Sequence, residues 1–260
     1  MSGKVLLATD GPIARVTLSH PGKLNAMSRA MWRALRDVFA SLQGRADVRC
    51  VVVTGEGGAF CAGGDISEYP DFRFDEKTLR DFHENEVWAG LQSMLDCDIP
   101  VIAQIEGNCM GAGVEVACCA DFRFASASAK FGAPIAKLGF PMAPREAALV
   151  CRVAGELTAR EMLLAATVLD PATMLQRGFL NRVVEDAALH ALVVETAARI
   201  VQLAPQAARM NKQSFRAFAQ EGRAVAAINS IAKPYAYASS AEHREGVMAF
   251  VEKRAPHFAR

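Results

Sequence analysis

The N-terminal part of the chain changes from an alternating pattern to a helical one. Residues 5–19 alternate around Asp10-Gly11, a pair that tolerates the positive φ angles of a tight turn, so they predict a β-hairpin. Ser28 can cap a following helix, which Gly44 would end. The apolar residues at helical spacing on one face of that helix are Met31, Leu35, Val38, Phe39 and Leu42.

The pattern of a strand, a small-residue turn and a helix then occurs twice in succession. Residues 49–54 are nearly all β-branched or small, which indicates a strand buried on both faces, and they lead into a Gly-rich loop at 55–64. Residues 75–95 carry apolar positions at near-helical intervals and predict a long surface helix. Pro100 then introduces a second buried strand at 101–105, followed by a turn that opens a helix.

The last third of the chain is dominated by helical patterns. After Pro144 we expect helices, interrupted by one short strand at residues 183–184, and a final amphipathic helix that opens at Ser240. Residues 1–200 are therefore interpreted as one α/β core domain and residues 201–260 as a helical C-terminal region.

Composition narrows the classes of function. The 260 residues are 52% hydrophobic with a formal net charge of +1, so no global field favours nucleic acid or an anionic membrane surface. No apolar run approaches the roughly 18 residues of a spanning helix, and no secretory signal is evident, so we expect a cytoplasmic protein. Seven cysteines without a CxxC pair indicate reduced core residues, and the absence of an HExxH motif predicts no metal.

The two small-residue turns are candidates for binding negative charge. Their glycines, in residues 59–66 and 107–113, let backbone amides face a ligand. The second turn ends at the start of a helix, where unpaired N–H groups and the helix dipole favour an anion. Two such turns facing each other would form an oxyanion hole for a thioester carbonyl, and one lost donor of that kind typically costs about 2.7 to 4 kcal/mol.

Glu115 lies three residues after Ala112, so both fall on one face of the new helix. Partial burial would raise its pKa and the helix terminus would lower it, which suits a carboxylate that accepts and returns a proton. Each feature also has a simpler interpretation. The Gly-rich loop can be an ordinary tight turn, and Glu115 can be a residue that complements the helix dipole. Residues 111–117 also mimic a dinucleotide fingerprint but lack the acidic residue about 20 positions on. Cys61 reads as a packed thiol rather than a nucleophile.

At this point the chain resembles the crotonase, or enoyl-CoA hydratase/isomerase, superfamily. The resemblance implies an α/β fold of the crotonase/ClpP-like type, a spiral of ββα units whose helical C-terminal region takes part in forming homotrimers or dimers of trimers. It implies an acyl-CoA substrate, with coenzyme A present only as part of the thioester. The segments that carry it include PGKLNAM (21–27), AFCAGGDI (59–66), IEGNCMGAGVEVACCAD (105–121) and REGVMAFVEKR (244–254).

The resemblance also assigns roles to residues. The oxyanion-binding amides would be those of Gly64 and Ala112, and Glu115 would be the acid/base. The residues that it places near coenzyme A are Lys23, Leu24, Ala62, Asp65 and Ile66, with Phe250 and Lys253 reaching the ligand of a neighbouring subunit.

One departure from the family pattern affects the predicted reaction. Ile135 stands where hydratases of this family carry a second glutamate, and Ala143 replaces a glycine of the turn that follows. General acid–base help is worth about 10² to 10⁴-fold, so a poor standard hydratase is expected. Glu146 could substitute, although near a helix start it is interpreted as complementing the dipole.

Several functions therefore stay open. Double-bond isomerisation, or another reaction that needs one base and a stabilised enolate, ranks about equal with hydration. The alternative from another class is a non-catalytic acyl-CoA-binding or moonlighting member. The acyl pocket should be lined by residues 69–95 and 140–144, whose details the sequence does not predict.

Overall fold

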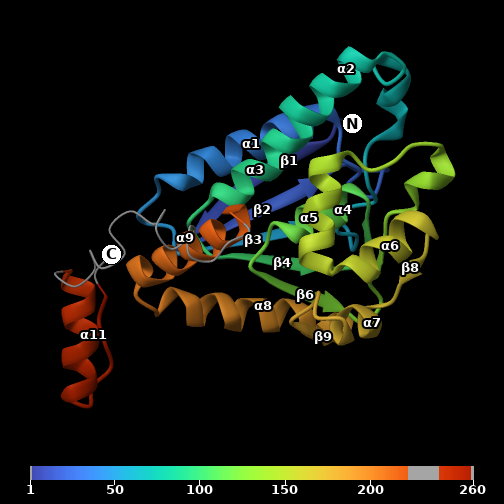
Figure 1. Cartoon of the computed structure of the whole chain (residues 1–260). Coiled ribbons are helices and arrows are strands. Elements are labelled where there is room, and N and C mark those ends of the chain that lie inside the picture. Colours follow the sequence, from blue (N-terminus) through green and yellow to red (C-terminus); the bar gives the residue numbers. More distant parts are fainter. Residues whose placement is uncertain (1, 222–239, 259–260) are drawn as a thin grey trace.

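The computed structural model describes residues 2–221 and 240–258. Six strands form one sheet in the order β1-β2-β3-β4-β6-β9, in which only the first pair is antiparallel (Figure 1). The strands of this sheet are β1 (Lys4–Asp10), β2 (Ile13–Ser19), β3 (Cys50–Gly55), β4 (Val101–Ile105), β6 (Phe122–Ser126) and β9 (Arg182–Val184).

The N-terminal predictions are confirmed. β1 and β2 pair in the register Lys4↔Ser19, as the alternation around the Asp-Gly turn predicts. Helix α1 (Arg29–Gln43) begins after Ser28, whose hydroxyl accepts a hydrogen bond from the Met31 amide at 3.2 Å, and Gly44 ends it.

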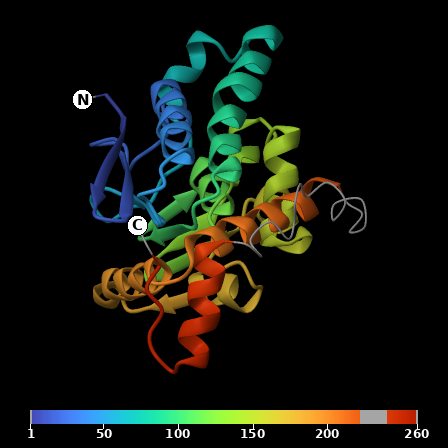
Figure 2. The same cartoon turned by 90° about the vertical axis from the view of Figure 1, so that its left-hand side faces the viewer.

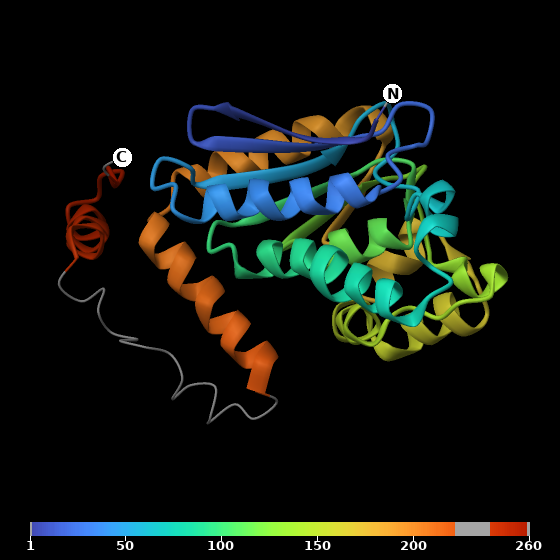
Figure 3. The same ribbon diagram turned by 90° about the horizontal axis from the view of Figure 1, so that it is seen from above.

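Helices cover both faces of the sheet. α1 and α3 (Trp88–Asp96) lie on one face and α8 (Asp186–Val201) lies on the other (Figures 1 and 3). β3 is buried on both sides, since Val51 and Val53 join the larger core cluster while Cys50 and Val52 join the cluster beneath α8. This two-sided burial is what the nearly continuous apolar run predicts.

A second, three-stranded sheet was not expected. β5 (Asn108–Met110) pairs with β7 (Lys130–Gly132), which pairs with β8 (Val168–Leu169). Where the sequence suggested only a turn over residues 107–113, a strand of three residues precedes the turn. Strands this short carry no period that a sequence could show.

The predicted helix over residues 75–95 is present in three parts. Asp75 caps α2 (Glu76–Asp81), a π-helical segment η2 (Phe82–Val87) follows, and α3 completes it. The other helical elements are η1 (Ile66–Asp71), α4 (Ala112–Cys118), η3 (Pro134–Leu138), α5 (Pro144–Ala154), α6 (Glu156–Leu164) and α7 (Pro171–Gln176).

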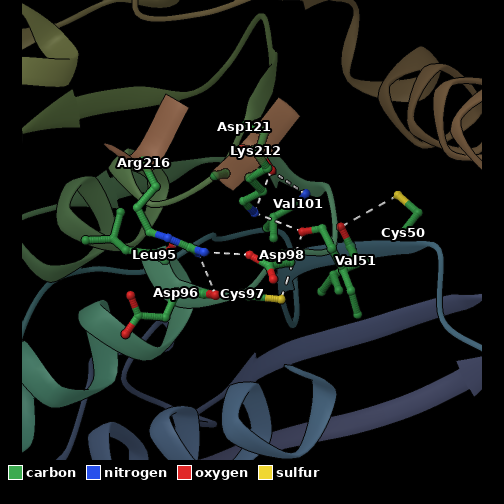
Figure 4. Close-up of polar contacts among 12 residues, drawn as sticks. Cys50, Val51, Leu95, Asp96, Cys97, Asp98, Val101, Asp121, Lys212 and Arg216 are labelled. Atoms are coloured by element: carbon green, nitrogen blue, oxygen red, sulfur yellow. Dashed lines mark hydrogen bonds and ion pairs between the residues drawn. The ribbon is translucent and has the colours of Figure 1, made fainter. Parts of the chain in front are cut away.

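The helical C-terminal region begins with α9 (Pro205–Glu221), which is anchored by two basic side chains (Figure 4). Lys212 Nζ contacts the Asp121 carboxylate and the Ile99 carbonyl, both at 2.8 Å, and Arg216 contacts Asp98 at 2.6 Å. These contacts lie at the entry to β4 and hold α9 against the core.

α11 (Ala241–Val251) lies at one end of the molecule, away from the sheet (Figures 1 and 3), and that end faces the viewer in Figure 2. The division at residue 200 and the part of residues 201–260 in oligomerisation stay predictions. Within the described part of the chain no single helix has the length and apolar composition to cross a membrane; only α8 taken together with residues 205–218 passes, and that pair is bent by 106°.

Candidate active site

The two small-residue turns meet at one edge of the sheet. They follow the carboxyl ends of β3 and β4, which are parallel neighbours. The Cys61 amide donates to the Asn108 carbonyl, and the Met110 amide donates to the Cys61 carbonyl, both at 2.8 Å. Ligands of open parallel sheets bind at such an edge. The predicted juxtaposition of the two turns is therefore present.

Both predicted oxyanion amides are free of protein partners within the described residues. The Met27 amide donates a hydrogen bond to the Gly63 carbonyl, and the Asp65 amide donates one to the Met27 carbonyl, both at 2.8 Å. Because successive residues of an extended chain face opposite ways, the Gly64 N–H points away from Met27. Ala112 is the first residue of α4, where the N–H has no partner within the helix. Both residues line the same cavity.

Glycine is required where the turns touch. A Cβ on Gly113 would lie 2.6 Å from the Cys61 carbonyl oxygen, closer than real contacts allow. Gly111, with φ of 46°, turns the chain from β5 into α4. Cys61 itself is fully buried, which raises the pKa of its thiol to about 12, in keeping with a packed residue.

Glu115 is buried in the first turn of α4, and its carboxylate faces the cavity. Burial raises its pKa to about 8, and the charge of Glu146 adds to the rise. Among the described residues no group donates a hydrogen bond to this carboxylate. The opposing pull expected from the helix terminus does not prevail, so Glu115 can hold or release a proton near neutral pH.

Glu146 is also buried and does more than complement a helix dipole. It lies in the first turn of α5, and its Oε1 is 3.1 Å from His83 Nδ1. His83 lines the cavity that Glu115 faces. A histidine whose ring is held by a carboxylate is therefore present beside the candidate base, although Ile135 and Ala143 on the cavity wall carry no ionisable group.

The cavity has a volume of about 220 Å³. Its wall includes Gly64, Ala112 and Glu115, together with Ala62 and Ile66. Both segments predicted to surround the acyl group contribute to it. They supply Tyr69, Arg73, Phe82, His83 and Val87 from the first segment, and Phe140, Pro141, Met142 and Ala143 from the second.

The residues predicted to contact coenzyme A lie in two places. Lys23 Nζ is held by the buried Asp65 carboxylate at 2.7 Å and by the Ser67 hydroxyl at 2.7 Å, so both have protein partners. Leu24 is exposed beside Ala62, whose amide donates to the Leu24 carbonyl. Ile66 is half exposed.

The two C-terminal candidates are separate from the cavity wall. Lys253 is exposed just after α11, with φ of 54°. Phe250 belongs to α11, but its side chain falls outside what the structure describes. A role for either at a neighbouring subunit stays a prediction.

Sequence reasoning missed Arg73 and the pairing of His83 with Glu146. Both depend on a segment whose residues reach the site only after folding, and His83 and Glu146 are 63 positions apart. No local spacing signals such a pair. The described residues contain no group of three or more His, Cys, Asp or Glu side chains arranged to hold a metal ion.

Comparisons with known proteins bear on the family and the fold of the chain. The enoyl-CoA hydratase/isomerase family model matches residues 8–260. A solved enoyl-CoA hydratase/carnitine racemase from Magnetospirillum magneticum superposes with a TM-score of 0.92 at 36% identity, covering 98% of this chain and 95% of that one.

Two curated relatives are similar over almost their whole length. The short-chain-enoyl-CoA hydratase of Clostridium acetobutylicum is 30% identical over 96% of this chain and 95% of the relative. The carnitinyl-CoA dehydratase of Salmonella typhi is 30% identical over 98% of each. These matches confirm the predicted spiral α/β fold and an enzyme of the lyase or isomerase kind. The chain belongs to the enoyl-CoA hydratase/isomerase family, the crotonase superfamily.

Proposed function

We propose that the protein binds an acyl-CoA thioester with its carbonyl oxygen between the N–H groups of Gly64 and Ala112. Removing a proton from the α-carbon places negative charge on that oxygen, and two preorganised donors stabilise it. The free amides at the junction of the two turns support this assignment. The acyl chain would extend into the cavity, and the coenzyme A part of the thioester would lie along Leu24 and Ile66 towards the surface.

Glu115 is the proposed proton carrier. The observation that carries the proposal is a buried carboxylate with its pKa raised to about 8, in the same cavity as the two uncommitted amides. A group that titrates close to the working pH can take a proton from one carbon and return it to another. Substrate binding and the enolate step therefore require no second carboxylate.

Isomerisation between 2-enoyl and 3-enoyl thioesters is the reaction that a single base serves directly. Ile135 supports it, because this residue can neither position nor deprotonate a water. Hydration is the second candidate, and one observation favours it. His83, held by Glu146 on the wall of the same cavity, offers a second ionisable group in place of the missing glutamate.

Deuterium exchange and turnover together test the proposal. In D₂O the wild-type enzyme should exchange the α-proton of a 3-enoyl-CoA, and Glu115→Gln should lose exchange by at least about 10²-fold. Conversion of the 3-enoyl to the 2-enoyl isomer supports isomerisation, whereas rapid hydration of crotonyl-CoA supports the second candidate. Exchange that survives Glu115→Gln unchanged would reject Glu115 as the acid/base.

A further inference from the structure

An arginine from the segment predicted to surround the acyl group lines the cavity. Arg73 follows η1, is partly buried, and lines the cavity together with Glu115. Its guanidinium lies over the Phe140 ring, 3.7 Å from the centroid, and 4.6 Å from that of Tyr69. The two rings, which meet edge to face, fix the side chain in place. Arg73 is therefore a held group rather than a freely moving surface side chain.

No anion in the described part of the chain balances this charge. The Arg73 guanidinium takes part in no ion pair or hydrogen bond with those residues, and burial lowers its pKa. Other arginines nearby differ, since Arg29 and Arg33 both contact Glu86 and Arg145 contacts Glu84. A guanidinium removed from water without a partner costs free energy, which an anionic ligand would recover.

We infer that the acyl group of the substrate carries a carboxylate at its distal end, which Arg73 binds. This inference rests on the proposed function, because it assumes that the cavity holds the acyl chain. The planar fork of an arginine matches a carboxylate with two parallel hydrogen bonds. The apolar walls formed by Leu138 and Met142 would contact the methylene or alkene part between the thioester and the anion.

The same geometry argues against a cationic acyl group. Aromatic rings can hold a quaternary ammonium, as a carnitinyl thioester would require. Here one face of Tyr69 and one face of Phe140 are already covered by the protein's own cation. A second positive charge would meet Arg73 directly. The protein should therefore differ in specificity from its carnitinyl-CoA dehydratase relative.

Binding of saturated thioesters tests the inference without requiring turnover. Calorimetry would compare glutaryl-CoA with pentanoyl-CoA, which lacks the distal charge, and with γ-butyrobetainyl-CoA, which carries a cation. We expect the wild type to bind glutaryl-CoA about 10 to 100-fold more tightly than pentanoyl-CoA, as a charge-assisted pair implies. Arg73→Met should remove this preference and leave pentanoyl-CoA binding within a few-fold.

Two further variants complete the design. Arg73→Lys should keep part of the preference, because the charge remains while the fork is lost. Arg145→Met, which removes an exposed arginine paired with Glu84, should leave the preference unchanged. Equal binding of glutaryl-CoA and pentanoyl-CoA by the wild type, or a preference that survives Arg73→Met, would overturn the inference.

The binding result is separable from the catalytic one. If no thioester exchanges its α-proton but the wild type prefers glutaryl-CoA through Arg73, the proposed reaction fails and the carboxylate site stands. If exchange depends on Glu115 but no preference depends on Arg73, the reaction stands and the substrate class is wrong.

Discussion

Replacing Glu115 by glutamine should stabilise the protein while removing its proton carrier. The substitution keeps the shape of the side chain and removes its charge. Because burial and Glu146 raise the pKa of Glu115, the folded protein holds the proton more tightly than the unfolded chain does. The free energy of unfolding is therefore highest at low pH, where Glu115 is protonated in both states. It falls as pH rises from about 4.5 to about 8.

The size of the effect follows from the shift. The pKa of Glu115 rises from 4.5 to about 8, and each unit corresponds to about 1.36 kcal/mol. The ionisation penalty is then about 1 kcal/mol at pH 5, about 3 kcal/mol at pH 7 and about 4 kcal/mol at pH 8. A neutral amide in the same place does not change its charge, so this pH-dependent penalty disappears.

Urea unfolding at pH 5 and pH 8 measures the difference between the two proteins. Both should be compared at one protein concentration, since any association would add to apparent stability. Glu115→Gln should be more stable than the wild type by about 1 kcal/mol at pH 5 and by about 4 kcal/mol at pH 8. An exposed glutamate, Glu156, provides the control, and its change to glutamine should show no such pH trend. A difference that stays constant between the two pH values would refute the reasoning.

Three other substitutions test neighbouring parts of the structure. Glu146→Gln removes the like charge that helps to raise the pKa of Glu115, so the rise of kcat/KM with pH should move to lower pH; an unmoved profile would contradict the coupling. Gly113→Ala would place a Cβ 2.6 Å from the Cys61 carbonyl and separate the two turns, so kcat/KM for the proposed reaction should fall by at least about 10-fold. Ser28→Ala removes a helix cap and should cost about 1 kcal/mol in urea unfolding with little effect on activity.

The sequence predicted those elements that depend on residues close together in the chain. The Asp-Gly hairpin, the Ser28 cap and the strand–turn–helix at Gly111 each depend on residues within a few positions of one another. The facing of the two turns also followed from sequence, because strands covered on both faces pair in parallel and present their carboxyl ends at one edge. The free amides at Gly64 and Ala112 are a consequence of that arrangement.

The remaining parts depend on contacts that no local pattern encodes. The strand of two residues, Val168–Leu169, exists only because β7 pairs with it. Segment 82–87 has a helical apolar period, but neither its π-helical turn nor the contact of His83 with Glu146 in α5 can be read from that period. Arg73 appeared in the sequence as one more basic residue in a polar stretch, and only its position between two rings makes it a candidate for binding.

Four groups that lack a hydrogen-bond or ionic partner among the described residues lie at one cavity. Several other charged side chains in the described part of the chain are paired, as where Arg29 and Arg33 both contact Glu86. At the cavity the four groups are two backbone amides, the carboxylate of Glu115 and the guanidinium of Arg73, whose only described contacts are with aromatic rings. Each such group destabilises the folded chain, so their coincidence is better explained by a ligand than by chance. A thioester with a distal carboxylate would bind to the two amides through its carbonyl oxygen and to Arg73 through its carboxylate. Glu115 would then remain free to move a proton from one carbon of the acyl chain to another.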